Sequence, residues 1–259
     1  MKRIWSHVVS LVVVGMAASA AMPACAANDQ TIFIRSALAP SINRQMAGCI
    51  YTNDPTQAQL FEARADLGVT DSYFAILLVG NQMIPRGDSL SNRAESNRVH
   101  ISGAIVRVTE ADGTLIREFT SLATGFADAA STNTPAYASV GITALDAITR
   151  DMLLPSLPNR IVSKTVLINV KAFGTSLGGK DVESGEFQLP MQVCNGCLVD
   201  FTTGNDDTLP PAMQPNCKKP LAMAPSFATS PCFPGQDEPV LCQTCVGKRD
   251  ACDPTKLNP

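Results

Sequence analysis

Two pairs of cysteines have a spacing that could perform chemistry. Cys194 and Cys197 form one C-x-x-C pair, and Cys242 and Cys245 form another. Two such pairs can supply the four thiolates of a zinc site, and one pair alone can act as a redox-active dithiol. The 44 residues between the pairs exceed the gap of a usual zinc ribbon. The first cysteine of a redox pair normally opens a helix, which the residues after Cys197 do not resemble. The sequence therefore favours structural disulfides, with no metal and no cofactor.

The number of cysteines constrains how these disulfides form. The chain has nine, of which Cys25 lies at the end of an N-terminal apolar segment. Cleavage or acylation there takes Cys25 out of the thiol pool, and the eight that remain predict up to four disulfides in an oxidising compartment. Seven of the eight follow Val193, so Cys49 must pair with one of them if all are oxidised within one chain. The cysteines predicted to form disulfides are Cys49, Cys194, Cys197, Cys217, Cys232, Cys242, Cys245 and Cys252.

Histidine is scarce in the sequence. The chain has two histidines, and His7 belongs to the N-terminal segment that export would remove. A Ser-His-Asp or Cys-His arrangement, or a histidine-based zinc site, would have to use His100, which stands in the middle of a predicted strand. We therefore expect His100 to be an ordinary, partly buried histidine, and we predict no catalytic residue.

Acidic pairs are the remaining candidates for catalysis, because two carboxyl groups can hydrolyse a glycosidic bond. One pair flanks the start of a predicted strand, and two others lie in loops of the C-terminal tail, where solvated charge is the ordinary interpretation. A hydrolase built on these groups is therefore the less favoured alternative. The acidic residues are Glu183, Glu186, Asp206, Asp207, Asp237 and Glu238.

Composition limits the partners. Without Lys2 and Arg3 the chain carries 18 basic and 23 acidic side chains, and it has no basic cluster longer than two residues. Nucleic acid and anionic membrane surfaces both require a basic footprint and are therefore poor partners. The single tryptophan, Trp5, lies in the N-terminal segment, which weakens sugar binding by stacking without excluding it. A glycan- or peptide-binding module would instead show an exposed aromatic or apolar groove.

The first 25 residues have the features of a signal peptide. A basic start precedes a mostly apolar run at residues 4–21, and small residues follow at Ala24 and Ala26. This pattern predicts an exported protein rather than a transmembrane anchor. Two processing routes fit the sequence equally well. One is an ordinary A-x-A cut, and the other is an imperfect lipobox at residues 22–25, after which Cys25 would be acylated.

Strand patterns dominate the rest of the chain. Residues 187–193 alternate apolar and polar side chains, and Cys194 falls in the polar phase, so its sulfur should point away from the core. Residues 73–79 are apolar on both phases and predict a central strand. The dipeptide Asp112-Gly113 predicts a hairpin turn between residues 98–109, with a bulge near Gly103, and residues 115–122.

Other segments complete the predicted fold. The apolar pattern predicts further strands at residues 31–35, 61–69, 137–143 and 161–173. In the second of these, Phe61 falls in the apolar phase and Asp66 in the polar phase. Residues 123–135 read as a loop, and residues 145–153 have helical spacing. Many strands with one short helix and no βαβ alternation predict an all-β fold, an antiparallel Ig-like β-sandwich with a disulfide-rich irregular C-terminal tail.

This pattern implies four regions. A signal peptide occupies residues 1–25, and an N-terminal segment with the first strand occupies residues 26–58. The β-sandwich follows at residues 59–193, and a tail rich in cysteine and proline at residues 194–259. The tail has almost no periodic apolar pattern, so we expect disulfides to stabilise it in place of a core.

Several blocks of this sequence resemble a known group of proteins. They are residues 77–82 (LLVGNQ), 170–174 (VKAFG), 178–187 (GGKDVESGEF) and the Cys194-x-x-Cys197 pair. They look like recurring blocks in uncharacterised exported lipoproteins of the myxobacterial type, and the resemblance covers about residues 70–252. It implies an envelope lipoprotein, but it brings no established activity and no catalytic residue. The imperfect lipobox departs from the pattern of the group.

These observations together predict a function. We expect a non-enzymatic lipoprotein of the cell envelope or surface, anchored to the outer membrane through lipid on Cys25, with a structural or binding role in an envelope assembly. Its partner is expected to be an envelope protein. The alternatives are a glycan- or peptide-binding module and, less favoured, the acidic-residue hydrolase.

Overall fold

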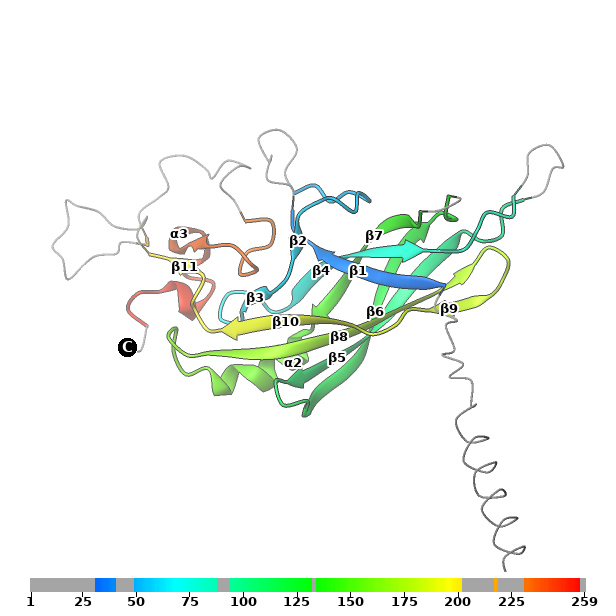
Figure 1. The fold of residues 1–259 in the computed structure, drawn as a ribbon. Helices are drawn as coiled ribbons and strands as arrows, with labels where there is room; N and C mark the ends of the chain where they lie inside the picture. Colours follow the sequence, from blue (N-terminus) through cyan, green and yellow to red (C-terminus); the bar gives the residue numbers. More distant parts are fainter. Residues whose placement is uncertain are drawn as a thin grey trace, which may run out of the picture.

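The structure is a computed structural model that describes residues 31–40, 49–87, 94–131, 134–201, 217–218 and 231–256. The predicted signal peptide with Cys25 lies outside these residues, and so do Asp206 and Asp207. Within the described residues the chain is built mainly of strands (Figure 1), which confirms the all-β fold class. The finer Ig-like assignment stays a prediction.

The strands form two main sheets. The first contains β1 (Ile32–Leu38), β2 (Gln59–Leu60), β4 (Tyr73–Asn81) and β7 (Ala136–Leu145). The second contains β3 (Ala63–Asp66), β5 (Val99–Glu110), β6 (Leu115–Ala127), β8 (Ser163–Ser176), β9 (Asp181–Glu183) and β10 (Phe187–Cys194). The order is β2-β1-β4-β7 in the first sheet and β3-β10-β8-β5-β6 in the second, with β9 paired to β8. Strand pairs in these sheets are antiparallel as predicted, except that β3 runs parallel to β10.

The two sheets share one hydrophobic core. Leu77 and Ile142 enter it from the first sheet, and Ile101, Ile168 and Met191 enter it from the second. The apolar face predicted within residues 166–172 is buried, because every second side chain of β8 points to this core. β4 is a central strand, as its two apolar phases predict, and lies between β1 and β7.

The predicted bulge and hairpin are both present. The register of β5 against β6 and β8 shifts between Ile101 and Gly103. Gly113 has a φ of 90° in the turn that follows β5, a backbone region that suits glycine. The Asp112 carboxylate accepts a hydrogen bond from the Thr114 amide at 2.9 Å, which fixes the turn locally.

Two predicted strands begin later than their sequence patterns suggest. Phe61 lies in a bend between β2 and β3 and is 86% exposed, so its assignment to the apolar phase was wrong. The alternation with a buried phase starts only at Ala63, where β3 begins. β8 likewise begins at Ser163, which leaves Ile161 exposed before the strand. In both cases an apolar residue just before the strand continued the alternation in the sequence, although it is not paired with a neighbouring strand.

The loop and the helix also differ from the prediction. β6 continues through the start of the predicted loop to Ala127, because its ladder with β5 extends to the Val99–Ala127 pair. The helix α2 (Ala147–Leu153) is followed by a short 3-10 helix, η1 (Leu154–Ser156). Ile148 and Met152 of the predicted apolar face are exposed, since this short helix buries only Thr149 and Leu153.

The described part of the tail forms a second, smaller core. β11 (Val199–Asp200) pairs in parallel with β12 (Val240–Leu241), and α3 (Cys242–Cys245) and the 3-10 helix η4 (Asp250–Cys252) follow. The cluster around them consists mostly of half-cystines and valines: Val69, Val199, Cys217, Val240, Cys242, Cys245 and Cys252. Sulfur therefore supplies much of the apolar interior that the tail sequence lacks.

Four disulfides join the eight predicted cysteines. Three lie within the tail: Cys194–Cys197, Cys217–Cys242 and Cys245–Cys252. The fourth joins Cys49 to Cys232 across 183 residues of sequence, as the odd number of tail cysteines requires. Disulfides indicate that the protein resides outside the reducing cytoplasm.

The residues before β12 dock the tail on the sandwich. The Gln236 backbone bridges to Ala65, and the amides of Asp66 and Asp237 donate to the carbonyls of Gly235 and Arg64 at 2.8 and 2.9 Å. These hydrogen bonds satisfy the backbone of β3 on the side away from β10.

In the part of the chain that the structure describes, no helix combines the length and apolar character needed to cross a membrane.

Candidate functional site

His100 does not assemble a catalytic group. It lies on β5, half-buried, and its ring packs against Phe126 with 4.8 Å between the ring centroids. The Arg98 guanidinium lies over the Phe126 ring, 4.7 Å from its centroid. These are stacking contacts, rather than the hydrogen bonds that orient a general base.

The described acidic residues serve different neighbours. Glu183 pairs with Lys171 at 3.5 Å, and Glu186 lies 3.6 Å from Arg107. Such partly exposed ion pairs contribute little to stability and are common on surfaces. Glu183 and Glu186 thus have different basic partners.

Asp237 is a buried anchor for the tail. Its carboxylate accepts hydrogen bonds from the Tyr73 hydroxyl at 2.6 Å and from the Arg64 amide at 2.8 Å. Burial raises the pKa of Asp237 above its ordinary value, and these hydrogen bonds partly oppose the shift. The pKa of Tyr73 is also raised, first by burial and then by the nearby Asp237 charge. Their interaction holds the tail against β3 and β4.

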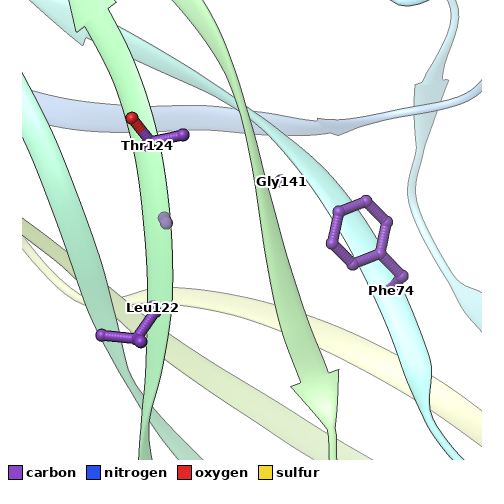
Figure 2. A pocket seen from close by; sticks show the side chains of 5 residues that line it. Phe74, Leu122, Thr124 and Gly141 are labelled. Atoms are coloured by element: carbon purple, nitrogen blue, oxygen red, sulfur yellow. The ribbon is translucent and has the colours of Figure 1, made fainter.

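An apolar hollow lies where the two sheets meet. It has a volume of about 430 Å³ and is lined by Phe74 of β4, Gly141 of β7, and Leu122, Ala123 and Thr124 of β6 (Figure 2). Phe74 is 37% exposed and Leu122 is 86% exposed. The lining contains one hydroxyl group and no titratable group. The hollow can therefore hold apolar groups, and it offers nothing that would transfer a proton.

The strands that shape the hollow are the terminal strands of their sheets. β7 ends the first sheet and β6 ends the second. The Thr143 amide of β7 donates to the Ser121 hydroxyl of β6 at 2.8 Å, which holds the two strands together at the base of the hollow. The walls thus belong to rigid ladders rather than to loops.

Gly141 is needed for the aromatic wall. A Cβ atom at this position would lie 2.4 Å from Cζ of Phe74, so only glycine lets the ring lie across β7. The Phe74 ring also meets the edge of Phe233 in the tail, with centroids 5.5 Å apart. Phe233 follows Cys232, so the disulfide to Cys49 helps to place this neighbour.

A second cluster surrounds the Cys194–Cys197 disulfide. Asp66 ends β3 and is in register with Cys194 at the end of the parallel strand β10. The Asp66 carboxylate accepts hydrogen bonds from the amides of Gly196, Leu198 and Gly68 at 2.7, 2.9 and 3.1 Å. It therefore holds together the chain turns that leave the two strands.

Burial shapes the charge state of Asp66. The residue is fully buried, although its place in the polar phase predicted an exposed side chain. Burial raises the pKa of its carboxyl group, while the backbone hydrogen bonds act in the opposite direction. The prediction failed because the turn that follows Cys194, and the tail that packs beside it, cover the face of β3 that a strand pattern alone assigns to solvent.

Cys194 is likewise fully buried. It lies outside the main core cluster, as its phase predicts, but its Sγ atom lies 3.8 Å from the Ala65 carbonyl oxygen and is covered. A carboxylate oxygen of Asp66 and the sulfurs of Cys194 and Cys197 lie within 4.8 Å of one another. Three such groups could ligate a metal, but in this structure the two sulfurs are joined to each other.

Some of these residues left no signal in the sequence. Gly68 permits the contact between the two turns, since a Cβ atom there would lie 2.3 Å from Oδ1 of Asn195. Phe74, Leu122 and Gly141 meet only because β4, β6 and β7 come together in the fold. A glycine opposite an aromatic residue on a neighbouring strand is the one pattern that could have indicated the hollow.

Comparisons of the chain with protein-family models, with curated proteins and with solved structures gave no match.

Proposed function

We propose that this protein is an exported envelope protein with a binding role, and that the hollow beside Gly141 holds apolar side chains from an extended segment of an envelope partner. The observation that carries the proposal is the hollow itself. It is open and apolar, it is built on sheet strands, and it lacks titratable groups. Its volume of about 430 Å³ is in the range of small binding sites.

The lining favours peptide side chains over other ligands. Sugars need several hydrogen-bonding groups beside a stacking ring, and Thr124 is the only polar side chain in the lining. Hydrolysis by paired carboxyl groups would need acidic residues, and none lines the hollow. Aliphatic and aromatic side chains fill such a site through burial of apolar surface, at about 25 cal/mol per Å².

We expect Leu122→Asp to weaken partner binding at least tenfold, because loss of a buried leucine contact is worth about 1.5–3 kcal/mol. Leu122 is 86% exposed, so the variant should keep the melting temperature of the wild type. The measurement is quantitative affinity capture from detergent-solubilised envelope. Leu115→Asp is the matched control, because it places the same charge on an exposed leucine at the start of β6. Equal capture by the two variants would contradict the proposal.

The anchoring of the protein is a second part of the proposal. The segment around Cys25 has the order of features found in exported lipoproteins, and the resemblance to lipoproteins of the myxobacterial type supports the same assignment. We infer that Cys25 is acylated and that the lipid holds the protein in the outer membrane. An anchored sandwich would present its hollow to other envelope proteins.

Labelling of cells with a fatty-acid analogue tests this anchor. We expect the wild-type protein to carry the label and to fractionate with membranes, and we expect Cys25→Ser to lose both properties. Intact mass spectrometry of the mature chain is the control. A mass that begins at Ala27 without lipid would show that the ordinary cleavage is used instead.

A further inference from the structure

We propose that the Cys194–Cys197 disulfide is a thiol-exchange site, which accepts two electrons from an external dithiol through the sulfur of Cys197 while Asp66 supplies a proton to Cys194. This inference concerns a different part of the molecule from the hollow, and it does not depend on the proposed binding function. It rests on the unequal burial of the two cysteines and on the carboxyl group placed beside them.

The two cysteines differ in burial. Cys197 is exposed, whereas Cys194 is fully buried at the end of β10. An attacking thiolate must approach a disulfide sulfur directly, so Cys197, the less buried of the two residues, is the expected point of attack. The attack leaves the second sulfur as the leaving group, and here that leaving group is buried. A thiolate created in such a place needs a proton, because burial disfavours its charge.

Asp66 is the acidic group beside these sulfurs, and we assign it the role of proton donor. A carboxylate oxygen lies within 4.8 Å of both sulfurs, and in the described chain no other disulfide has an acidic group or a histidine placed in this way. The carboxyl group reaches the site as part of the register between β3 and β10. Burial raises its pKa, so the protonated form persists to a higher pH than for an exposed aspartate.

The exchange can be written as a balanced sequence. The incoming thiolate forms a bond to Cys197 Sγ, and the electron pair of the Cys194–Cys197 bond moves to Cys194 Sγ. The Asp66 carboxyl proton passes to this sulfur. The second thiolate of the donor then attacks the donor's first sulfur, which is bonded to Cys197 in the mixed disulfide. Cys197 leaves as a thiolate and takes a proton from water. The donor becomes a disulfide, the protein becomes a dithiol, and Asp66 regains its proton from solvent.

The surroundings favour approach of an anionic thiolate. A polar cavity of about 190 Å³ lies next to the turn, lined by Arg160, Asn195, Asp250 and Lys256 among others. Lys256 pairs with Asp250 at 2.6 Å, while the Arg160 guanidinium lies over the Phe201 ring, 4.8 Å from its centroid. The positive charge of Arg160 in the lining of this cavity attracts a thiolate.

The bond is also the one whose loss would disturb the fold least. Cys194 and Cys197 are three residues apart in sequence, compared with separations of 7, 25 and 183 for the other disulfides. A cross-link over so few residues restricts the unfolded chain least. The amides of Gly196 and Leu198 also donate to Asp66, so the turn has ties to β3 in addition to the disulfide.

Graded reduction of the folded mature protein with dithiothreitol tests the proposal, with rapid alkylation and peptide mapping as the readout. We expect Cys194 and Cys197 to be alkylated at a dithiothreitol concentration at least tenfold below that needed for the other six cysteines. The Cys245–Cys252 disulfide is the internal control, since it also closes a short loop but both of its cysteines are buried. Reduction of all four disulfides together, with unfolding, would overturn the proposal.

Two serine variants identify the attacked sulfur. In Cys194→Ser the free Cys197 thiol should form a mixed disulfide with added oxidised glutathione. In Cys197→Ser the buried Cys194 thiol should react at least tenfold more slowly. The opposite order would overturn the assignment of Cys197.

A pH profile tests the role of Asp66. We expect the wild-type rate constant, expressed per dithiothreitol thiolate, to fall as pH rises through the Asp66 pKa, and the profile of Asp66→Asn to be flat. Glutathionylation of Cys197 should be unchanged in the Asp66→Asn, Cys194→Ser double variant. Identical profiles for Asp66→Asn and wild type would show that Asp66 donates no proton. The variant leaves in place the charged groups on the elements around Asp66, which are Arg64, Asp71, Arg150, Arg160, Asp237, Arg249, Asp250 and Lys256.

Discussion

Replacing Cys49 and Cys232 together with serine is expected to lower the free energy of unfolding by about 5 kcal/mol, because a link that closes so long a loop restricts the unfolded chain strongly. Their sequence separation is 183 residues. The same change frees Phe233 from its position against Phe74. Thermal unfolding followed by circular dichroism should show a melting temperature lower by roughly 10–20 °C for a protein of this size.

The double variant of Cys245 and Cys252 is the matched control. It also removes one disulfide, but the separation is only 7 residues, so the expected loss is about 2.5 kcal/mol. If the two double variants lost the same stability, loop length would not be the source of the effect. Peptide mapping without reduction should find the remaining three disulfides intact in each variant.

The Asp66→Ala variant should lose about 3 kcal/mol of stability, because three backbone amides lose their acceptor in a buried site and each unsatisfied group costs about 1–3 kcal/mol. These are the amides of Gly68, Gly196 and Leu198. Loss of the negative charge that burial disfavours partly offsets the cost. Denaturant unfolding of wild type and variant gives the difference directly.

The pH dependence of this difference has a definite sign. Because burial raises the pKa of Asp66 in the folded state, the unfolded chain binds fewer protons than the folded one over the range between the two pKa values. The stabilising contribution of Asp66 is therefore complete below the unfolded pKa, near ~4, and declines as pH rises through the folded pKa. The gap between wild type and Asp66→Ala should be largest near pH ~4 and narrower at pH ~7. A gap that widened with pH would show that the hydrogen bonds outweigh burial.

Features that depend on local pattern could be predicted from the sequence. The alternation of residues 166–172 identified a buried face, and the dipeptide Asp112-Gly113 identified a hairpin. Both rest on short-range physics, since side chains alternate along any strand and glycine suits a tight turn. That Cys49 pairs with a tail cysteine could also be predicted, because an odd number of tail cysteines cannot all pair among themselves.

Features that depend on how distant strands meet could not be predicted. Asp66 reads as a polar residue of a half-exposed strand, and only its parallel neighbour β10 and the tail make it buried. The hollow needs Gly141 beneath the ring of Phe74 and Leu122 on a strand of the other sheet. Phe61 shows the opposite error. It was predicted to be buried and is exposed, because an apolar residue just before a strand cannot be told from part of the strand by its type alone. Periodicity describes one strand and says nothing about what covers its faces.

The pairing of Cys49 with Cys232 also sets the order in which the protein can mature. In a chain that crosses a membrane from its N-terminus, Cys49 would meet Cys194 and Cys197 before Cys232 had crossed. Oxidation in order of emergence would join Cys49 to the wrong partner. Cys49 must therefore stay reduced until translocation is nearly complete, or be released from a premature bond by disulfide isomerisation, which takes seconds to hours. Formation of the native disulfides thus requires that Cys49 remain available until Cys232, close to the end of the chain, can reach it.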